Sequence, residues 1–148
     1  MRTLFKASRL KALGAALGVA ALAVPAAAQF GGPPPPPNTG IPVFAKLVGG
    51  DGSGQFTGVI DPPKGTFCYI MNVAGLDDVT AAHVHIGGPG EDGRPVIPLE
   101  TPSGGTAGAC VPIAADLAQA VLGNPQGYYV NLHTGVQPGG AIRGQLMR

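Results

Sequence analysis

The chain contains three histidines, and their spacing is the first feature that could support chemistry. His83 and His85 are separated by a single residue within an apolar stretch. On a β-strand such residues share one face and lie about 7 Å apart at Cα, two rises of ~3.3–3.4 Å. A third imidazole, from His133 on a neighbouring strand, would complete a set of three nitrogen ligands suited to Zn²⁺ or Cu²⁺. The spacing therefore raises the hypothesis of a metal site at His83, His85 and His133.

The same histidines also have a structural interpretation. Glycine-rich segments at 87–93 and 134–140 follow the histidine strands, and their backbone polar groups need hydrogen-bond partners. Imidazoles can supply such bonds, and Arg143 would pair with Glu91 or Asp92 or donate to loop carbonyls. The sequence leaves the metal site and the structural polar cluster both open.

Cys68 and Cys110 are the two cysteines of the chain. A small, even number of cysteines in an exported protein indicates one disulfide, and two separate buried thiols are the alternative. The bond would close a loop of 43 residues, counted from 68 to 110 inclusive. In the chain-entropy model such a loop stabilises the fold by roughly 4 kcal/mol.

The histidines and cysteines lie in a part of the chain where short apolar runs are separated by glycine and proline. This pattern indicates an antiparallel β structure. We expect strands near 42–48, 54–60, 66–74, 79–86, 95–99, 107–112, 127–133 and 140–147. One short helix is expected at 114–122, because Pro125 prevents its continuation. Strands and helices do not alternate along the chain, which argues against a parallel sheet.

Alternation along the strands predicts which side chains are buried. In 82–86 the apolar residues Ala82, Val84 and Ile86 share one face, and the two histidines share the other. In 128–133 apolar residues likewise alternate with a second set that contains His133. The three imidazoles are therefore expected on the face that points away from the core.

Two segments of the chain together resemble the CHRD (chordin) domain family. They are VTAAHVHIGGPGEDGRPVIPL (79–99) and GYYVNLHTGVQPGGAIRGQL (127–146), and CYIMNVAGL (68–76) is similar to the strand that precedes the histidine pair in that family. The resemblance covers about residues 42–147. It implies an extracellular β-sandwich. Together with the strands and the helix expected above, the predicted fold is an antiparallel Greek-key β-sandwich of about eight strands with one short helix.

The resemblance also directs attention to four polar residues within the motifs. They are Asn131, Thr134, Arg143 and Gln145, which we expect to form a polar cluster with the histidines. Ala141 stands where many family members carry an acidic residue, so no role is assigned to a carboxylate there. The chain has one domain and lacks the cysteine-rich modules of chordin, so antagonism of growth factors is not transferred to it.

Known catalytic motifs are missing from the sequence. We find no nucleophile elbow, phosphate-binding loop or dinucleotide fingerprint, and we assign no catalytic residue. The His-x-His pattern is similar to that of copper–zinc superoxide dismutases, but a fourth, suitably placed histidine is absent. The sequence favours a non-enzymatic interaction or envelope module, with a small copper- or zinc-binding protein as the alternative.

The first 28 residues have the three regions of a secretory signal peptide. A basic start is followed by an uncharged run at 12–24, and three alanines at 26–28 place the cleavage between Ala28 and Gln29. The apolar run has 13 residues (24 − 12 + 1), fewer than the about 20 needed to span a bilayer. We expect a signal peptide at 1–28, a proline-rich linker at 29–40 and one domain at 41–148.

Removal of the signal peptide would change the charge of the protein. Residues 29–148 retain five basic side chains against eight acidic ones, so the net charge falls from +1 to −3. A sparsely charged, mildly acidic domain has no field that would attract nucleic acid. We therefore expect a secreted or periplasmic protein without a membrane span after cleavage. Its expected partners are an extracellular protein, a cell-envelope component or a metal ion.

Overall fold

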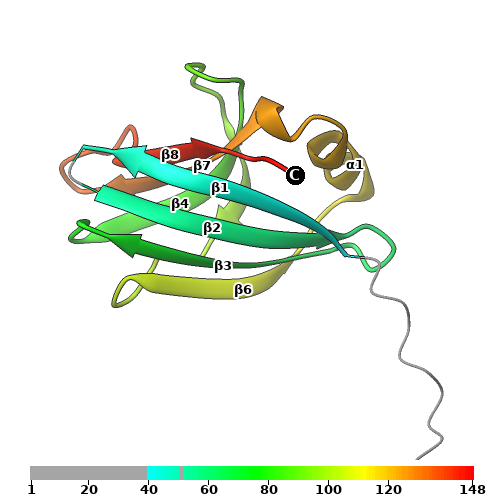
Figure 1. Cartoon of the computed structure of the whole chain (residues 1–148), viewed down its shortest axis with the longest axis horizontal. Helices are drawn as coiled ribbons and strands as arrows, with labels where there is room; N and C mark the ends of the chain where they lie inside the picture. Colours follow the sequence, from blue (N-terminus) through cyan, green and yellow to red (C-terminus); the bar gives the residue numbers. More distant parts are fainter. Residues whose placement is uncertain (1–39, 51) are drawn as a thin grey trace, which may run out of the picture. The chain divides into compact units, whose positions relative to one another are not determined.

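A computed structural model describes residues 40–50 and 52–148, which form eight β-strands and one α-helix (Figure 1). The strands are β1 (Ile41–Gly49), β2 (Gly52–Asp61), β3 (Thr66–Ala74), β4 (Val79–Ile86), β5 (Pro95–Leu99), β6 (Thr106–Pro112), β7 (Tyr128–Thr134) and β8 (Ile142–Gln145). Helix α1 (Ala115–Gly123) and the 3₁₀ turn η1 (Pro125–Gly127) connect β6 to β7. The predicted signal peptide, its cleavage point and the proline run lie outside the described residues.

All eight strands belong to one antiparallel sheet with the order β5-β4-β7-β8-β1-β2-β3-β6. The sheet curls, so that β4 and β7 lie behind β1 and β2 in Figure 1. The connections β3–β4 and β5–β6 pass from one half of the sheet to the other. The predicted antiparallel β class with one short helix is confirmed, and the two layers of the sandwich are parts of one continuous, nearly closed sheet.

The core lies between the two halves of this curled sheet. Its side chains come from alternate positions of the strands and include Val43, Leu47, Phe56, Ile60, Phe67, Met71, Val84, Val130 and Leu132. Helix α1 adds Ala118 and Val121. Because each strand gives every second side chain to the core, the intervening residues of β4 and β7 face outward.

One expectation about the buried faces is wrong. Ile86 was expected on the buried face of β4, but 40% of it is exposed, whereas His85 is only 7% exposed. The pairing between β4 and β5 shifts register between Val84 and His85. The unpaired residue of this irregularity is Val96 on β5, and β4 keeps its regular alternation against β7. Ile86 is the last residue of β4, and the alternation of residue types does not show where along a strand burial ends.

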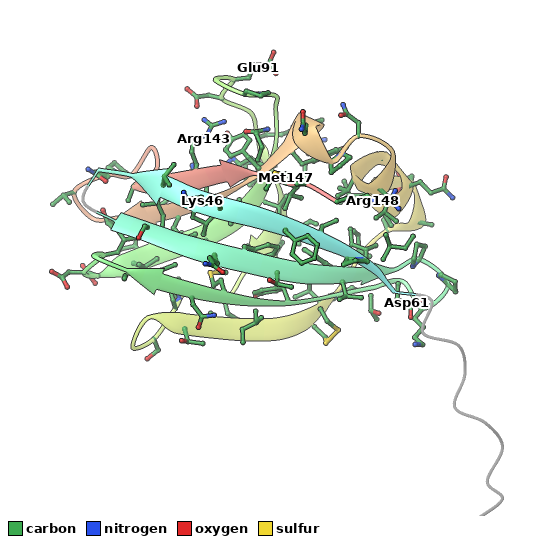
Figure 2. The ribbon with its side chains drawn as sticks, viewed as in Figure 1. Lys46, Asp61, Glu91, Arg143, Met147 and Arg148 are labelled. Carbon is green, nitrogen blue, oxygen red and sulfur yellow. A yellow bond between two sulfur atoms is a disulfide. The ribbon has the colours of Figure 1, made fainter. Side chains whose placement is uncertain are left out.

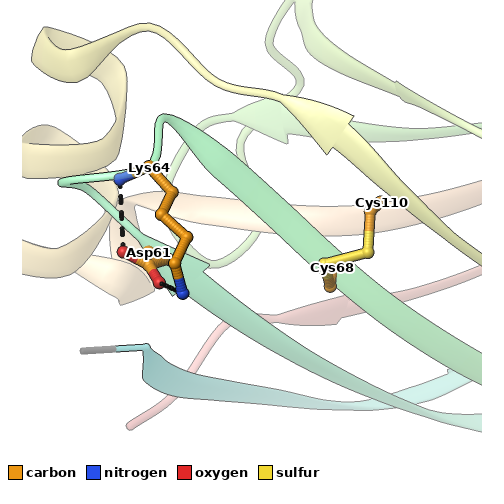
Figure 3. Close-up of a disulfide and its surroundings, with 4 residues drawn as sticks. All are labelled: Asp61, Lys64, Cys68 and Cys110. Atoms are coloured by element: carbon orange, nitrogen blue, oxygen red, sulfur yellow. Dashed lines mark hydrogen bonds and ion pairs between the residues drawn. A yellow bond between two sulfur atoms is a disulfide. The ribbon is translucent and has the colours of Figure 1, made fainter. Parts of the chain in front are cut away.

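The predicted disulfide is confirmed. Cys68 on β3 and Cys110 on β6 are direct cross-strand partners, and their sulfur atoms are bonded (Figure 3). Strand β6 is an edge of the sheet that pairs with β3 alone. The disulfide therefore joins this edge strand covalently to its single neighbour, in the half of the sheet that does not carry the histidines.

Candidate metal centre

Strands β4 and β7 bring the three histidines together. His83 and His85 occupy alternate positions of β4, so both side chains leave the same face. On the adjacent β7, His133 pairs with Ala81, Asn131 pairs with His83, and Tyr129 pairs with His85. Cross-strand partners share a face of a sheet. All three imidazoles thus lie on the outer face of the β4–β7 pair.

The three rings form a nearly equilateral triangle. Their centroids are 5.6 Å apart for His83 and His85, 5.4 Å for His83 and His133, and 5.5 Å for His85 and His133. One ring nitrogen from each residue lies within 4.8 Å of the nitrogens from the other two. Two nitrogens on one tetrahedral Zn²⁺, each at about 2.0–2.1 Å, are about 3.4 Å apart. Small side-chain rotations would therefore bring the nitrogens to ligand distances.

Two backbone carbonyls fix the orientation of two of these rings. Nδ1 of His85 lies 2.8 Å from the carbonyl oxygen of Gly93, and Nδ1 of His133 lies 2.8 Å from that of Pro138. A carbonyl oxygen only accepts hydrogen bonds, so each Nδ1 carries the proton and donates it. In the neutral ring Nε2 then presents its lone pair. Histidines that bind metals in proteins are commonly oriented by such a bond from the other nitrogen.

Each of the three rings has one buried nitrogen without a partner among the described residues. In the described part of the chain, four buried side-chain polar atoms make no hydrogen bond: Nδ1 of His83, Nε2 of His85, Nε2 of His133 and Oδ1 of Asn131. Leaving a buried polar atom unpaired costs about 1–3 kcal/mol. A metal ion would satisfy the three nitrogen lone pairs together.

The surroundings of His83 favour its uncharged form. Burial lowers the pKa of His83 below the usual 6.5, and the neighbouring His133 and His85 lower it further. A neutral imidazole is the form that binds a metal ion. The environment therefore favours the ligand state of this side chain at neutral pH.

The loop between β4 and β5 is tied to β7 and β8 by several side chains. Arg143 donates to Oδ1 of Asp92 at 3.1 Å and to the carbonyl oxygen of Glu91 at 2.9 Å. Figure 2 shows its side chain directed from β8 toward the loop that carries Glu91. The hydroxyl of Tyr129 accepts a bond from the Gly93 amide at 3.1 Å. These contacts hold the carbonyl of Gly93, and hence the ring of His85, in place.

The other two motif residues organise turns near the histidines. Gln145 donates to the carbonyl oxygens of Gly87 and Gln126, at 3.0 and 2.7 Å. Thr134 is buried, and its hydroxyl accepts a bond from the Gln137 amide at 3.1 Å. That turn precedes Pro138, whose carbonyl orients His133. Gln145 and Thr134 therefore have structural roles here.

A comparison with models of protein families identifies the family of this chain. The CHRD domain model matches residues 24–146, nearly the whole length. The chain belongs to the CHRD domain family. CHRD domains are extracellular, and the Cys68–Cys110 disulfide fits that setting. A comparison with curated proteins found no match.

The match begins at residue 24, and the segment boundaries at 28 and 40 stay predictions. Among residues 40–50 and 52–148, no helix is long and apolar enough to cross a membrane.

The structure brings together all the histidines that the sequence of this CHRD domain suggested, and Asn131 and Arg143 with them. The two interpretations of the histidines turn out to be compatible: Nδ1 of His85 and of His133 holds a loop, while Nε2 is left without a partner. Sequence reasoning missed Tyr129 and the carbonyls of Gly93 and Pro138. Backbone carbonyls carry no residue-specific signal, but the position of Tyr129 opposite His85 follows once the strand register is known.

Proposed function

We propose that this protein is an extracytoplasmic CHRD-domain module that binds one transition-metal ion, Cu²⁺ or Zn²⁺, through His83, His85 and His133. The observation that carries the proposal is the convergence of three imidazoles, each of which has a buried nitrogen without a hydrogen-bond partner among the described residues. Two of these rings are held in the ligand tautomer by backbone carbonyls. We assign no enzymatic reaction to the site.

Metal content of the untagged protein tests the proposal. An affinity tag of histidines would bind the same ions, so the chain is purified without one and analysed by native mass spectrometry after addition of Cu²⁺ or Zn²⁺. We expect one ion per chain. Metal-free protein, or several weakly bound ions per chain, would reject the proposal.

A variant that keeps the structural bond sharpens the test. In His85→Asn the side-chain amide can still donate to the carbonyl of Gly93, but the ligand atom Nε2 is lost. We expect this variant to fold and to lose the ion. Gln55→Ala, which changes an exposed polar residue of β2 on the other half of the sheet, serves as the control and should bind metal like the wild type.

A second candidate is an interaction or envelope module in which the histidines have only a structural role. The bonds from His85 and His133 to loop carbonyls favour it, because they stabilise both loops without any metal. In that case the wild type and His85→Asn would both be metal-free, and their melting temperatures would not respond to Cu²⁺ or Zn²⁺.

Export is a part of the proposal that a separate measurement tests. Cleavage between Ala28 and Gln29 would give a mature protein that begins at Gln29, secreted or retained in the periplasm. Intact mass of the exported protein should correspond to residues 29–148. Recovery of the full-length chain from that fraction would contradict cleavage.

A further inference from the structure

Asn131 lies in the middle of the outer face that carries the histidines. It pairs with His83 on β4 and with Arg143 on β8. Along β7 its neighbours on the same face are Tyr129 and His133. Only 3% of Asn131 is exposed. A polar side chain at such a position requires a hydrogen-bonding role, because burial of an unpaired amide is costly.

The orientation of the Asn131 amide follows from the one hydrogen bond that its side chain makes among the described residues. Nδ2 donates to the carbonyl oxygen of Gly139 at 3.2 Å. The reverse orientation would set Oδ1 against that carbonyl, so Oδ1 is the atom on the other side of the amide. Gly140 packs closely against the head of the amide and confines it, since a Cβ at Gly140 would clash with both Oδ1 and Nδ2. Oδ1 is therefore a fixed, buried acceptor without a donor.

We propose that Oδ1 of Asn131 accepts a hydrogen bond from a small oxygen ligand that occupies the fourth position on the metal ion. This inference rests on the proposed function, because three histidines leave one position of a tetrahedral ion open. Every unpartnered buried atom of the described residues is then satisfied: the ion takes the three nitrogens, and its ligand supplies the proton that Oδ1 lacks. The ligand class is one that can donate a proton, such as water, hydroxide or hydrogen peroxide.

Direct coordination of the ion by Asn131 is the other arrangement to consider. Amide oxygens suit hard ions such as Ca²⁺ and Mg²⁺, whereas an ion chosen by three imidazoles is Zn²⁺ or Cu²⁺. An amide that is bonded to Gly139 and confined by Gly140 also has little freedom to adjust to an ion. Acceptance of a hydrogen bond needs no such adjustment.

The acceptor Oδ1 makes the fourth ligand position of the metal ion selective for ligands that can donate a proton. Azide is a good ligand for Cu²⁺ but has no proton to donate, so its electron pairs would face the electron pairs of Oδ1. Replacement of Asn131 by leucine removes the acceptor at nearly constant volume. Azide should therefore bind to the copper-loaded Asn131→Leu protein about tenfold more tightly than to the wild type, the equivalent of one buried hydrogen bond.

The solvent ligand on the metal and the effect of Asn131 on azide binding can both be measured on copper-loaded protein. Pulsed electron paramagnetic resonance in D₂O detects exchangeable deuterons of a solvent ligand on Cu²⁺, and azide binding is followed by its charge-transfer absorption. We expect a solvent signal in the wild type, one copper per chain in both proteins, and the stated difference in azide affinity. Asn72→Leu, an exposed asparagine of β3, is the matched control and should bind azide like the wild type.

The outcomes separate the two proposals. If the wild type binds no copper, the proposed function fails, and the role of Asn131 fails with it. Bound copper without a solvent signal overturns the role of Asn131 alone, as does equal azide affinity in the wild type and Asn131→Leu. The solvent signal of the wild type decides the matter even if Asn131→Leu does not fold.

Discussion

Tyr129 stacks on His85, with ring centroids 5.0 Å apart and planes inclined by 18°. The guanidinium carbon of Arg143 lies 3.7 Å from the centroid of the same tyrosine ring. Arg143 also donates to the backbone of Glu91 and to the side chain of Asp92. Tyr129 thus links Arg143 to His85, which is a proposed metal ligand. Arg143 in turn holds the β4–β5 loop, whose Gly93 carbonyl orients His85.

Arg143→Ala is expected to weaken metal binding by 10–100-fold, the usual cost of losing a group that orients a metal ligand. The loss would come from the stacking on Tyr129 and from the bond to Glu91. The ion pair with Asp92 should matter little, because the Asp92 side chain is 94% exposed and exposed pairs contribute about 0–1 kcal/mol.

Asp92→Asn is therefore the control for Arg143→Ala and should bind metal nearly as the wild type does. Isothermal titration with Zn²⁺ measures both variants. Equal losses in the two variants would contradict the assignment of the stacked tyrosine as the important contact.

Gly93→Ala should release His85 from its position. A Cβ at Gly93 would clash with the carbonyl oxygen of Ile86, so the loop must move, and the Gly93 carbonyl moves with it. We expect a loss of metal affinity of at least about tenfold together with a lower melting temperature. Gly88→Ala in the same loop is the control, because its Cβ would approach only the flexible carboxylate end of Glu91, at 3.4 Å. A Gly93→Ala protein with wild-type affinity would show that the carbonyl does not orient His85.

The predicted strands agree closely with those of the structure, because period-two alternation and glycine-rich turns are local signals. The histidine face of β4 was likewise predictable from the alternation at 82–86. The pairing of β4 with β7 was not, because register depends on contacts between residues about 50 positions apart in the chain. The exposure of Ile86 was missed because alternation shows which face of a strand a residue occupies, but not where along the strand burial ends.

The candidate site shows the same division between local and non-local information. His83, His85 and His133 were named from residue type and spacing, and Arg143 was expected to pair with the loop at 91–92. The sequence did not show which ring nitrogen is free, because that depends on which carbonyl meets each ring. Nor did it show that Oδ1 of Asn131 has no partner, which follows from the position of Gly139 in the folded chain.

Stability of the metal-free protein should decrease below neutral pH. The pKa of His83 is lower in the folded protein than the value of 6.5 expected for the unfolded chain, mainly through burial. Below pH 6.5 the unfolded chain therefore binds more protons than the folded one, and the free energy of unfolding falls as pH drops. The decrease continues until the pH passes the folded pKa, and it then levels off.

Urea unfolding between pH 7.5 and 5, in the presence of a chelator, measures this effect. His83→Asn lacks the titrating ring, so its free energy of unfolding should fall less over the same range than that of the wild type. An equal decrease in both proteins would mean that His83 is not the group responsible.

Loss of the disulfide should lower stability but leave the metal site intact. Cys68 and Cys110 are separated by 42 positions, and in the chain-entropy model their bond contributes about 4 kcal/mol. The bond joins β3 to β6, whereas the histidines lie on β4 and β7. We expect the double variant Cys68→Ser/Cys110→Ser to unfold at lower urea concentration and to bind one metal ion when folded. Loss of metal binding in a folded double variant would contradict this prediction and show that the two halves of the sheet are coupled.

X-ray absorption of the zinc-loaded, untagged wild type tests the three-histidine centre most directly. We predict a four-coordinate ion with three imidazole nitrogens at about 2.0–2.1 Å and one additional light ligand, as in three-histidine zinc sites. A spectrum with six oxygen ligands, or one with fewer than three imidazoles, would contradict the centre at His83, His85 and His133.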